Sequence, residues 1–517
     1  MANSKYEYVK VDYEVNDEVM FPNFIVVNLH CCNSTTFYEF EQPNDERAVN
    51  LMNACATAVL KEYPDIVFAY GFGDEYSFVF SKETRFYQRR ASKILSLVVS
   101  CFSSNYVRSW KDYFPGLDLA GVPVFKSRVL CCANVEVVQT YLAWRQRECH
   151  AGNQYNTCLW NLVKGGKTEV EAREVLKGSG KQDKNEMLFQ QFGINYKSIN
   201  RMFRQGSCVV KTEIEAIVKH RDGVPVKRLR KDVIVEHHES IASRSFWNKH
   251  SCVVKEIGEF REDINKIKPE FVKSFEFENK LMPSTWIVVR IDGCHFHKFS
   301  EMHEFEKPND EQALNLMNSC AVAVLREFSD IVFAYGVSDE YSFVLKKDSQ
   351  LYQRRGSHIV SAIVSLFSAA YILEWMLFFP NKELKYIPSF DGRAVCYPSS
   401  KILQDYLAWR QVDCHINNQY NTCFWELVKS GRSKREAQKY LKGTQTNEKY
   451  ELLAQKFNIE YNKLPNMFRR GSSVFREEKD TVNTIGETQK RVVIKHCNII
   501  DSCFWEANPN ILNEEPL

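Results

Sequence analysis

One segment of this chain is present twice, and that duplication limits the folds open to it. DIVFAYGFGDEYSFV at 65–79 recurs as DIVFAYGVSDEYSFV at 330–344, which is 265 residues later. The same shift relates 41–208 to 306–473 without a gap. A repeat this long indicates duplicated domains, because solenoid units are only about 20–45 residues long. We predict a first domain over 1–250 and a second over 251–517, with a fused pseudo-symmetric dimer as the default interpretation.

Composition narrows the class of protein and its surroundings. The net charge is only +3, so a nucleic-acid partner would have to be held by local basic patches. The 17 cysteines are scattered without CxxC spacing, which indicates free thiols in a reducing, intracellular compartment. The apolar stretch 359–373 is shorter than the roughly 18 residues that span a bilayer, so we interpret it as a buried helix and expect no membrane partner.

The order of predicted elements indicates an α+β fold. In the second copy, β-branched and aromatic residues predict a strand over 284–292, and 330–336 with 340–347 form a hairpin. Helical spacing predicts helices over 310–328, 350–377 and 405–431, with Asn309 or Asp310 capping the first. A further helix over 434–443 ends at Gly443. We expect an antiparallel sheet with helices on one face.

Acidic residues fall where such a sheet would bring them together. Asp292 ends its strand, and Asp339 and Glu340 occupy the hairpin tip. Carboxylate oxygens suit Mg²⁺, and two such ions can hold the attacking and leaving oxygens of an in-line phosphoryl transfer. The candidates for hydrogen-bonding to phosphate near these carboxylates are His297, Lys298, Lys307, Arg354 and Arg355. Each signal alone is more typical of a turn or a solvated face, and only their order favours a metal site.

Five ordered motifs of the second copy resemble the tRNA-His guanylyltransferase family in its tandem-duplicated form. They are RIDGCHFHKF, FEKPND, YGVSDEYSFV, WRQVDCHINNQYNT and MFRRGS, within 270–478, and a weaker match covers 5–210. The resemblance implies two tandem palm-like domains, ferredoxin-like and similar to polymerase palms and nucleotide cyclases. It also implies reverse, 3′-to-5′ nucleotidyl transfer with two Mg²⁺ ions. ATP activates the 5′ phosphate of tRNA-His, and the 3′-hydroxyl of GTP attacks.

Residue roles carry over from the family only onto matching positions. Asp292, the backbone oxygen of Gly293, and Asp339 resemble the metal ligands, and Glu340 joins Asp292 and Asp339 as a catalytic candidate. The implied nucleotide-binding residues are Asp292, Gly293, Cys294, His295, Phe296, His297, Lys307, Asn309, Asp310, Ser338, Asp339 and Arg355. The implied tRNA-binding residues are His415, Asn417, Asn418 and Lys449. His358 departs from the family pattern, which has lysine there.

The first copy is altered where chemistry would occur. His30 and Cys31 stand in place of Asp292 and Gly293, although Asp74 and Glu75 survive. Histidine and cysteine are poor Mg²⁺ partners, so we predict that this copy has lost catalysis. The alternatives to guanylyl transfer are a repair-type 3′-to-5′ RNA polymerase, a palm-type nucleotide cyclase, or a protein that only binds tRNA. The resemblance also leads us to expect a homo-oligomer, a dimer of fused repeats, in the nucleus or, as the alternative, the cytoplasm.

Overall fold

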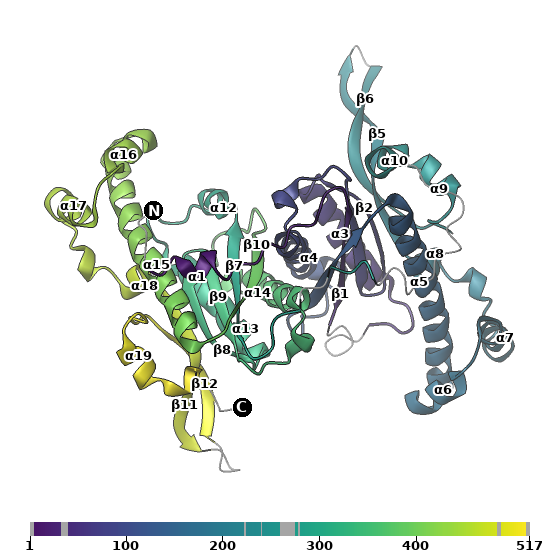
Figure 1. Cartoon of the computed structure of the whole chain (residues 1–517). Coiled ribbons are helices and arrows are strands. Elements are labelled where there is room, and N and C mark those ends of the chain that lie inside the picture. The colour runs from purple at the N-terminus through teal and green to yellow at the C-terminus, as the bar shows by residue number, and fades with distance from the viewer. Residues whose placement is uncertain are drawn as a thin grey trace. The chain divides into compact units, whose positions relative to one another are not determined.

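The computed structural model divides the chain into two compact units (Figure 1). We call Asp17–Glu278 the first unit, and Asn279–Leu517 together with Met1–Asn16 the second unit. The structure describes residues 5–32, 40–221, 224–238, 240–258, 274–277, 280–482 and 488–512, without the side chains of 213–231 and 478–490.

The second unit is built on an antiparallel sheet of six strands in the order β10-β7-β9-β8-β11-β12. The strands are β7 (Trp286–Cys294), β8 (Ile331–Val337), β9 (Glu340–Leu345), β10 (Ser389–Tyr397), β11 (Ser472–Val482) and β12 (Thr488–Lys495). The helices are α1 (Tyr8–Val11), α12 (Phe296–Met302), α13 (Glu311–Glu327), α14 (Gly356–Phe378), α15 (Ser400–Lys429), α16 (Lys434–Leu441), α17 (Thr446–Glu451), α18 (Asn466–Arg470) and α19 (Ser502–Ala507).

Side-chain hydrogen bonds fix the ends of these helices. The carboxylate of Asp310 caps α13 by accepting the backbone N–H of Ala313, which confirms one of the two predicted caps. Ser399 caps α15 in the same way, so that helix begins five residues before its predicted start at 405. Gly443 has a φ of +83° just after α16, as predicted for the residue that ends a helix.

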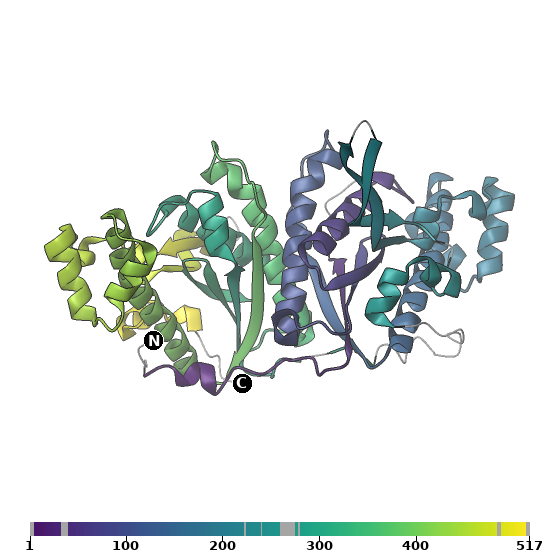
Figure 2. The same ribbon diagram turned by 90° about the horizontal axis from the view of Figure 1, so that it is seen from above.

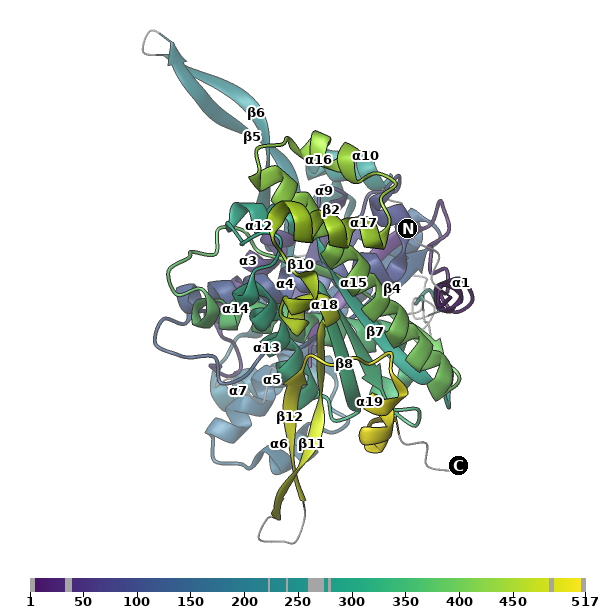
Figure 3. The same cartoon turned by 90° about the vertical axis from the view of Figure 1, so that its left-hand side faces the viewer.

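Helices cover both faces of the sheet, not one as the sequence predicts (Figures 2 and 3). Trp286 and Val288 of β7 pack in one core with residues of α15 such as Leu407. The alternate residue Ile291 lies on the other face, where Gly392 meets Val364 of α14. The prediction failed because β7 is apolar on both sides, with a buried residue at each of its first four positions.

The apolar helix α14 is a core element of this unit. It is long and apolar enough to cross a bilayer, but 78% of its apolar window is buried inside the protein. It packs against α13, β7 and β10. The prediction of a buried helix over 359–373 is therefore confirmed. The 17 cysteines, all of them among the described residues, form no disulfide bond, as their spacing predicts.

The first unit repeats this architecture, with strand order β4-β1-β3-β2-β5-β6. Its strands are β1 (Phe24–Cys31), β2 (Ile66–Phe72), β3 (Glu75–Phe80), β4 (Phe125–Cys132), β5 (Ser207–Arg221) and β6 (Val224–Glu236). Its helices are α3 (Glu46–Glu62), α4 (Ala91–Tyr113), α5 (Val135–Lys164), α6 (Glu169–Leu176), α7 (Lys181–Phe192), α8 (Arg201–Gln205), α9 (Arg244–Lys249) and α10 (Ser251–Ile257).

The division between the units lies later than the predicted boundary at 250. Val253 and Ile257 of α10 are buried in the core of the first unit, and Glu276 pairs with Leu130 of β4. The boundary was predicted near 250 because the chain turns polar and charged there, but the apolar face of α10 belongs to the preceding domain. Residues 5–16 also depart from the prediction, because they belong to the second unit.

Candidate active site

The strand end and the hairpin tip meet as the sequence predicts. Asp292 is the cross-strand partner of Glu340 on β9 and of Asp391 on β10. The backbone N–H of Gly293 donates to the carbonyl oxygen of Asp339 at 3.0 Å, which joins β7 to the β8–β9 turn. Ser338 forms that turn with a φ of +54°, a conformation that non-glycine residues rarely adopt. Acidic side chains from three strands thus converge at one edge of the sheet.

The electrostatics of this edge favour a bound cation. Burial, followed by the charges of Asp339 and Glu340, raises the pKa of Asp292 to about 7. Burial also raises the pKa of Asp339. No group of three His, Cys, Asp or Glu side chains is arranged to hold a metal in the part of the chain that the structure describes. A cation here would therefore need backbone, water or substrate oxygens besides the two aspartates, which is how Mg²⁺ usually binds.

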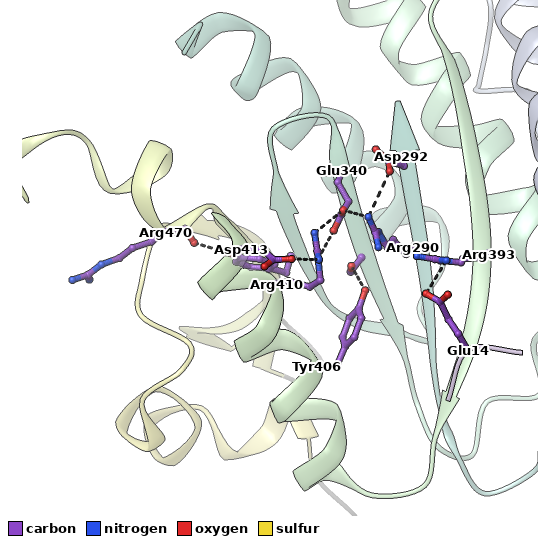
Figure 4. A network of polar contacts seen from close by, with 11 residues as sticks. Glu14, Arg290, Asp292, Glu340, Arg393, Tyr406, Arg410, Asp413 and Arg470 are labelled. Atoms are coloured by element: carbon purple, nitrogen blue, oxygen red, sulfur yellow. Dashed lines mark hydrogen bonds and ion pairs between the residues drawn. The ribbon is translucent and has the colours of Figure 1, made fainter. Parts of the chain in front are cut away.

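Glu340 lies in a different environment from the two aspartates (Figure 4). Its carboxylate accepts from Arg410 Nε at 2.7 Å and from Arg410 Nη2 at 2.8 Å, and it also pairs with Arg290. Arg290 Nη2 lies 3.5 Å from Asp292 Oδ2. Glu340 is 8% exposed. The two arginines neutralise Glu340, so the geometry gives this residue a structural place beside the metal-binding candidates.

A cleft of about 360 Å³ opens beside Asp339, which lines it, whereas Asp292 is not among the lining residues. Predicted nucleotide-binding residues line it, namely Phe296, His297, Lys307, Asn309, Asp310, Ser338 and Asp339, and so does the predicted tRNA-binding pair Asn417 and Asn418. Lys307 Nζ donates to Ser300 Oγ at 2.7 Å and lies 5.9 Å from the centre of the Trp425 ring. Lys434 Nζ lies 5.5 Å from the same ring, but it pairs with Glu301 at 2.8 Å and is not among the residues that line the cleft.

A hydrogen-bonded chain connects this cleft to the HINN motif at 415–418. Asn418 Nδ2 donates to Asn309 Oδ1 at 2.8 Å, and Asn418 Oδ1 accepts from the Tyr461 hydroxyl at 3.1 Å. The His415 ring packs edge-on against Tyr461, and burial lowers the pKa of His415. Asn417 is exposed, whereas Asn418 is 8% exposed. Of this motif, Asn417 is therefore placed to meet a ligand directly, and Asn418 holds Asn309 in position.

Other predicted residues serve the local structure. Asp310 accepts the backbone N–H groups of Glu306 and Ala313, both at 3.0 Å. His295 is the residue before α12, in a left-handed conformation with a φ of +52°. Cys294 is half-buried at the end of β7. Lys449 Nζ donates to the carbonyl oxygen of Thr444 at 2.7 Å, outside the lining of the cleft.

The expected phosphate contacts from Arg354 and Arg355 are not brought to this cleft within the unit. Arg354 is 2% exposed and donates to the carbonyl oxygen of Thr285 at 3.0 Å. Arg355 pairs with Lys280, and His358 follows in the first turn of α14. These contacts lie at the start of β7, roughly 20 Å along the strand from Asp292. The sequence order gave no indication of which end of the sheet these residues occupy.

The same edge of the first unit lacks the opposing aspartate. His30 faces Glu75 on β3 and Lys126 on β4. Burial, together with the nearby Lys126, lowers the pKa of His30 to about 4, so the ring is neutral at pH 7. Asn28 occupies the position of Arg290, and Arg145 still pairs with Glu75. The arginine and the aspartate of the second unit are therefore both absent from the first.

Comparisons with known proteins agree with this architecture. A family model described as tRNAHis guanylyltransferase matches residues 6–133 and 269–398, and one described as Thg1 C terminal domain matches 136–254 and 401–501. The tRNA(His) guanylyltransferases 1 and 2 of Arabidopsis thaliana are both 62% identical, over 99% of this chain and 91% and 100% of theirs. The crystal structure of the Saccharomyces cerevisiae tRNA(His) guanylyltransferase is 47% identical, covers 40% of this chain and 93% of that chain, and has a TM-score of 0.39.

Proposed function

Because this chain belongs to the tRNA(His) guanylyltransferase family, we propose that its second unit adds guanylate to the 5′ end of tRNA(His). The single observation that carries this proposal is the meeting of Asp292 and Asp339 beside a cleft that Asp339 and Lys307 line. ATP first transfers adenylate to the 5′ phosphate of the tRNA and releases pyrophosphate. The 3′-hydroxyl of GTP then attacks that phosphorus, a new P–O bond forms, and AMP leaves.

The charged and the amide side chains of the cleft have different roles in binding the substrates. Lys307, held by Ser300, lines the cleft, where it would meet phosphate oxygens. Burial lowers the pKa of Lys307, which reflects how far this ammonium has been removed from water. Asn309, fixed by Asn418, offers a directed amide for the nucleotide. Asn417 lies at the exposed side, where the tRNA end would enter.

Two Mg²⁺ ions fit this donor set. Burial, and after it the charges of Asp339 and Glu340, raise the pKa of Asp292, so a bound cation would favour its ionised form. When bound, such ions activate the attacking hydroxyl and stabilise the charge on the leaving oxygen. Asp292, Asp339 and the Gly293 carbonyl oxygen would hold them. The predicted dimer of fused chains and the predicted nuclear location stay predictions.

The proposal is tested by incorporation of radiolabelled GTP into tRNA(His) that lacks its extra 5′ guanylate. The full chain should label 5′-monophosphorylated tRNA(His) only when ATP and Mg²⁺ are present. A tRNA with another anticodon and acceptor end serves as the control and should stay unlabelled. Labelling of any truncated tRNA by whichever nucleotide its template strand specifies would instead favour the repair-type polymerase.

A further inference from the structure

The first residues of the chain complete the second unit. Val9 of α1 is fully buried in the core that contains Trp286 of β7 and Leu407 of α15. The Tyr8 hydroxyl donates to Asp405 Oδ2 at 2.7 Å. Figures 1 and 2 show α1 against the long helix α15. Residues 5–16, which the sequence assigns to the first repeat, are thus structural components of the second.

The exchange is reciprocal. The segment 274–277 belongs by sequence to the second repeat but packs on β4 of the first unit. There the Phe277 N–H donates to the carbonyl oxygen of Val129 at 2.8 Å. Glu276 pairs with Arg128 at 3.6 Å, and Glu14 pairs with Arg393 at 2.7 Å. Both glutamates stand ten residues before the first strand of their own repeat, and the two arginines are 265 residues apart. Each repeat therefore supplies the glutamate at this equivalent position to the unit that is built mainly from the other repeat.

Only one of these two pairs leads to the candidate active site. Arg393 is the cross-strand partner of Arg290, the arginine that contacts both Glu340 and Asp292 (Figure 4). In the first unit the equivalent Arg128 faces Asn28 and donates from Nε to Asn28 Oδ1 at 3.1 Å. The second unit thus has two arginines side by side where the first unit has one. The extra positive charge has to be balanced for both guanidinium groups to stay in place.

We propose that Glu14, supplied by the first repeat, is a positioning residue for guanylate transfer in the second unit. Its carboxylate holds the Arg393 guanidinium, so that Arg290, and not Arg393, contacts Glu340 beside Arg410 and reaches the edge of Asp292. Without Glu14, Arg393 is left beside Arg290 with an unbalanced charge and competes for the same carboxylates. This inference rests on the proposed function, and it gives the catalytically altered first repeat a direct part in the reaction.

The test compares Glu14→Gln with the matched variant Glu276→Gln in the full chain. Both substitutions remove one charge from an equivalent ion pair, so both should cost similar, small amounts of stability. Glu14→Gln should lower kcat for guanylate transfer by about 3- to 10-fold, the effect of losing a partly buried ion pair, with the KM for GTP little changed. Glu276→Gln should leave kcat unchanged. The reversed pair Glu14→Arg with Arg393→Glu should recover part of the loss seen in Glu14→Arg alone.

Amide hydrogen exchange gives a second measurement that does not depend on catalysis. In Glu14→Gln, exchange should quicken in 5–16 and at the β7–β10 edge, whereas Glu276→Gln should quicken exchange only in the first unit. Equal loss of kcat in both variants, or an unchanged kcat in Glu14→Gln, would overturn the proposal. If the unaltered chain adds no guanylate at all, the proposed function fails instead. In that case amide hydrogen exchange still tests whether Glu14 orders the β7–β10 edge. An exchange rate at that edge that is unchanged in Glu14→Gln would refute this role.

Discussion

The buried ion pair between Arg410 and Glu340 allows a prediction of stability. Arg410→Met keeps an unbranched apolar stem but removes the guanidinium that donates at 2.7 and 2.8 Å to Glu340. Arg410 and Glu340 are 7% and 8% exposed, so little water can replace the lost partner. Removing one member of a buried pair typically costs about 3–5 kcal/mol. Because Arg290 still neutralises Glu340, we expect the lower end, about 3 kcal/mol.

Amide exchange of β9 measures this cost for the second unit separately, because the most protected amides report global opening of their own domain. The control is Arg173→Met, which breaks the exposed pair with Glu169 in the first unit, where both side chains are about half exposed. That change should cost at most about 0.5 kcal/mol. If Arg410→Met lowered the opening free energy of β9 by less than about 1 kcal/mol, Glu340 would behave as a solvated residue and its structural role would be refuted.

Three further predictions concern single positions. Gly392→Ala places a Cβ 2.8 Å from Val364 Cγ2, so it should destabilise the second unit by about 1–3 kcal/mol in urea unfolding. An unchanged urea midpoint would show that α14 moves away from the new Cβ without cost. Burial lowers the pKa of His303, so the unfolded state binds a proton more readily than the folded state does. The free energy of unfolding should therefore fall as the pH drops below about 6.5. His303→Gln should reduce the difference between the urea midpoints measured at pH 7.5 and at pH 5.5. Asp74→Ala should leave guanylate addition within about twofold, since a single carboxylate edge cannot hold two ions, and a large loss would mean that the first unit takes part in the chemistry.

Local features of the fold were predictable from neighbouring residues. The cap at Asp310, the end of α16 at Gly443 and the hairpin around Ser338 each depend on interactions within a few positions. The convergence of Asp292 and Asp339 was also predictable, because a strand end and an adjacent hairpin tip share one edge of an antiparallel sheet. The presence of helices on both faces was not, since β7 is apolar in both directions and periodicity cannot distinguish its two sides.

The partners of the site residues depend on register between distant segments. Arg290 and Arg410 were missed because nothing near them in the sequence indicates that they meet at Glu340, 50 and 70 residues away. Their one signal was internal: Arg290 is replaced by Asn28 in the copy that also loses Asp292. Arg355 was placed wrongly for the same reason, because only the packing of α14 shows which end of β7 it adjoins. The exchanged segment at 5–16 has no signal in the repeat pattern.

The assay that tests the central claim most directly is single-turnover transfer of guanylate from labelled GTP to tRNA(His) by Asp292→Ala and Asp339→Ala. Both variants should keep the unfolding behaviour of the unaltered chain and lose at least about 10³-fold in rate, roughly 4 kcal/mol in activation free energy. That loss should exceed the 10- to 100-fold typical of residues that only support a metal ligand. Near-normal transfer by either folded variant would contradict the assignment of this edge of the second unit as the catalytic centre.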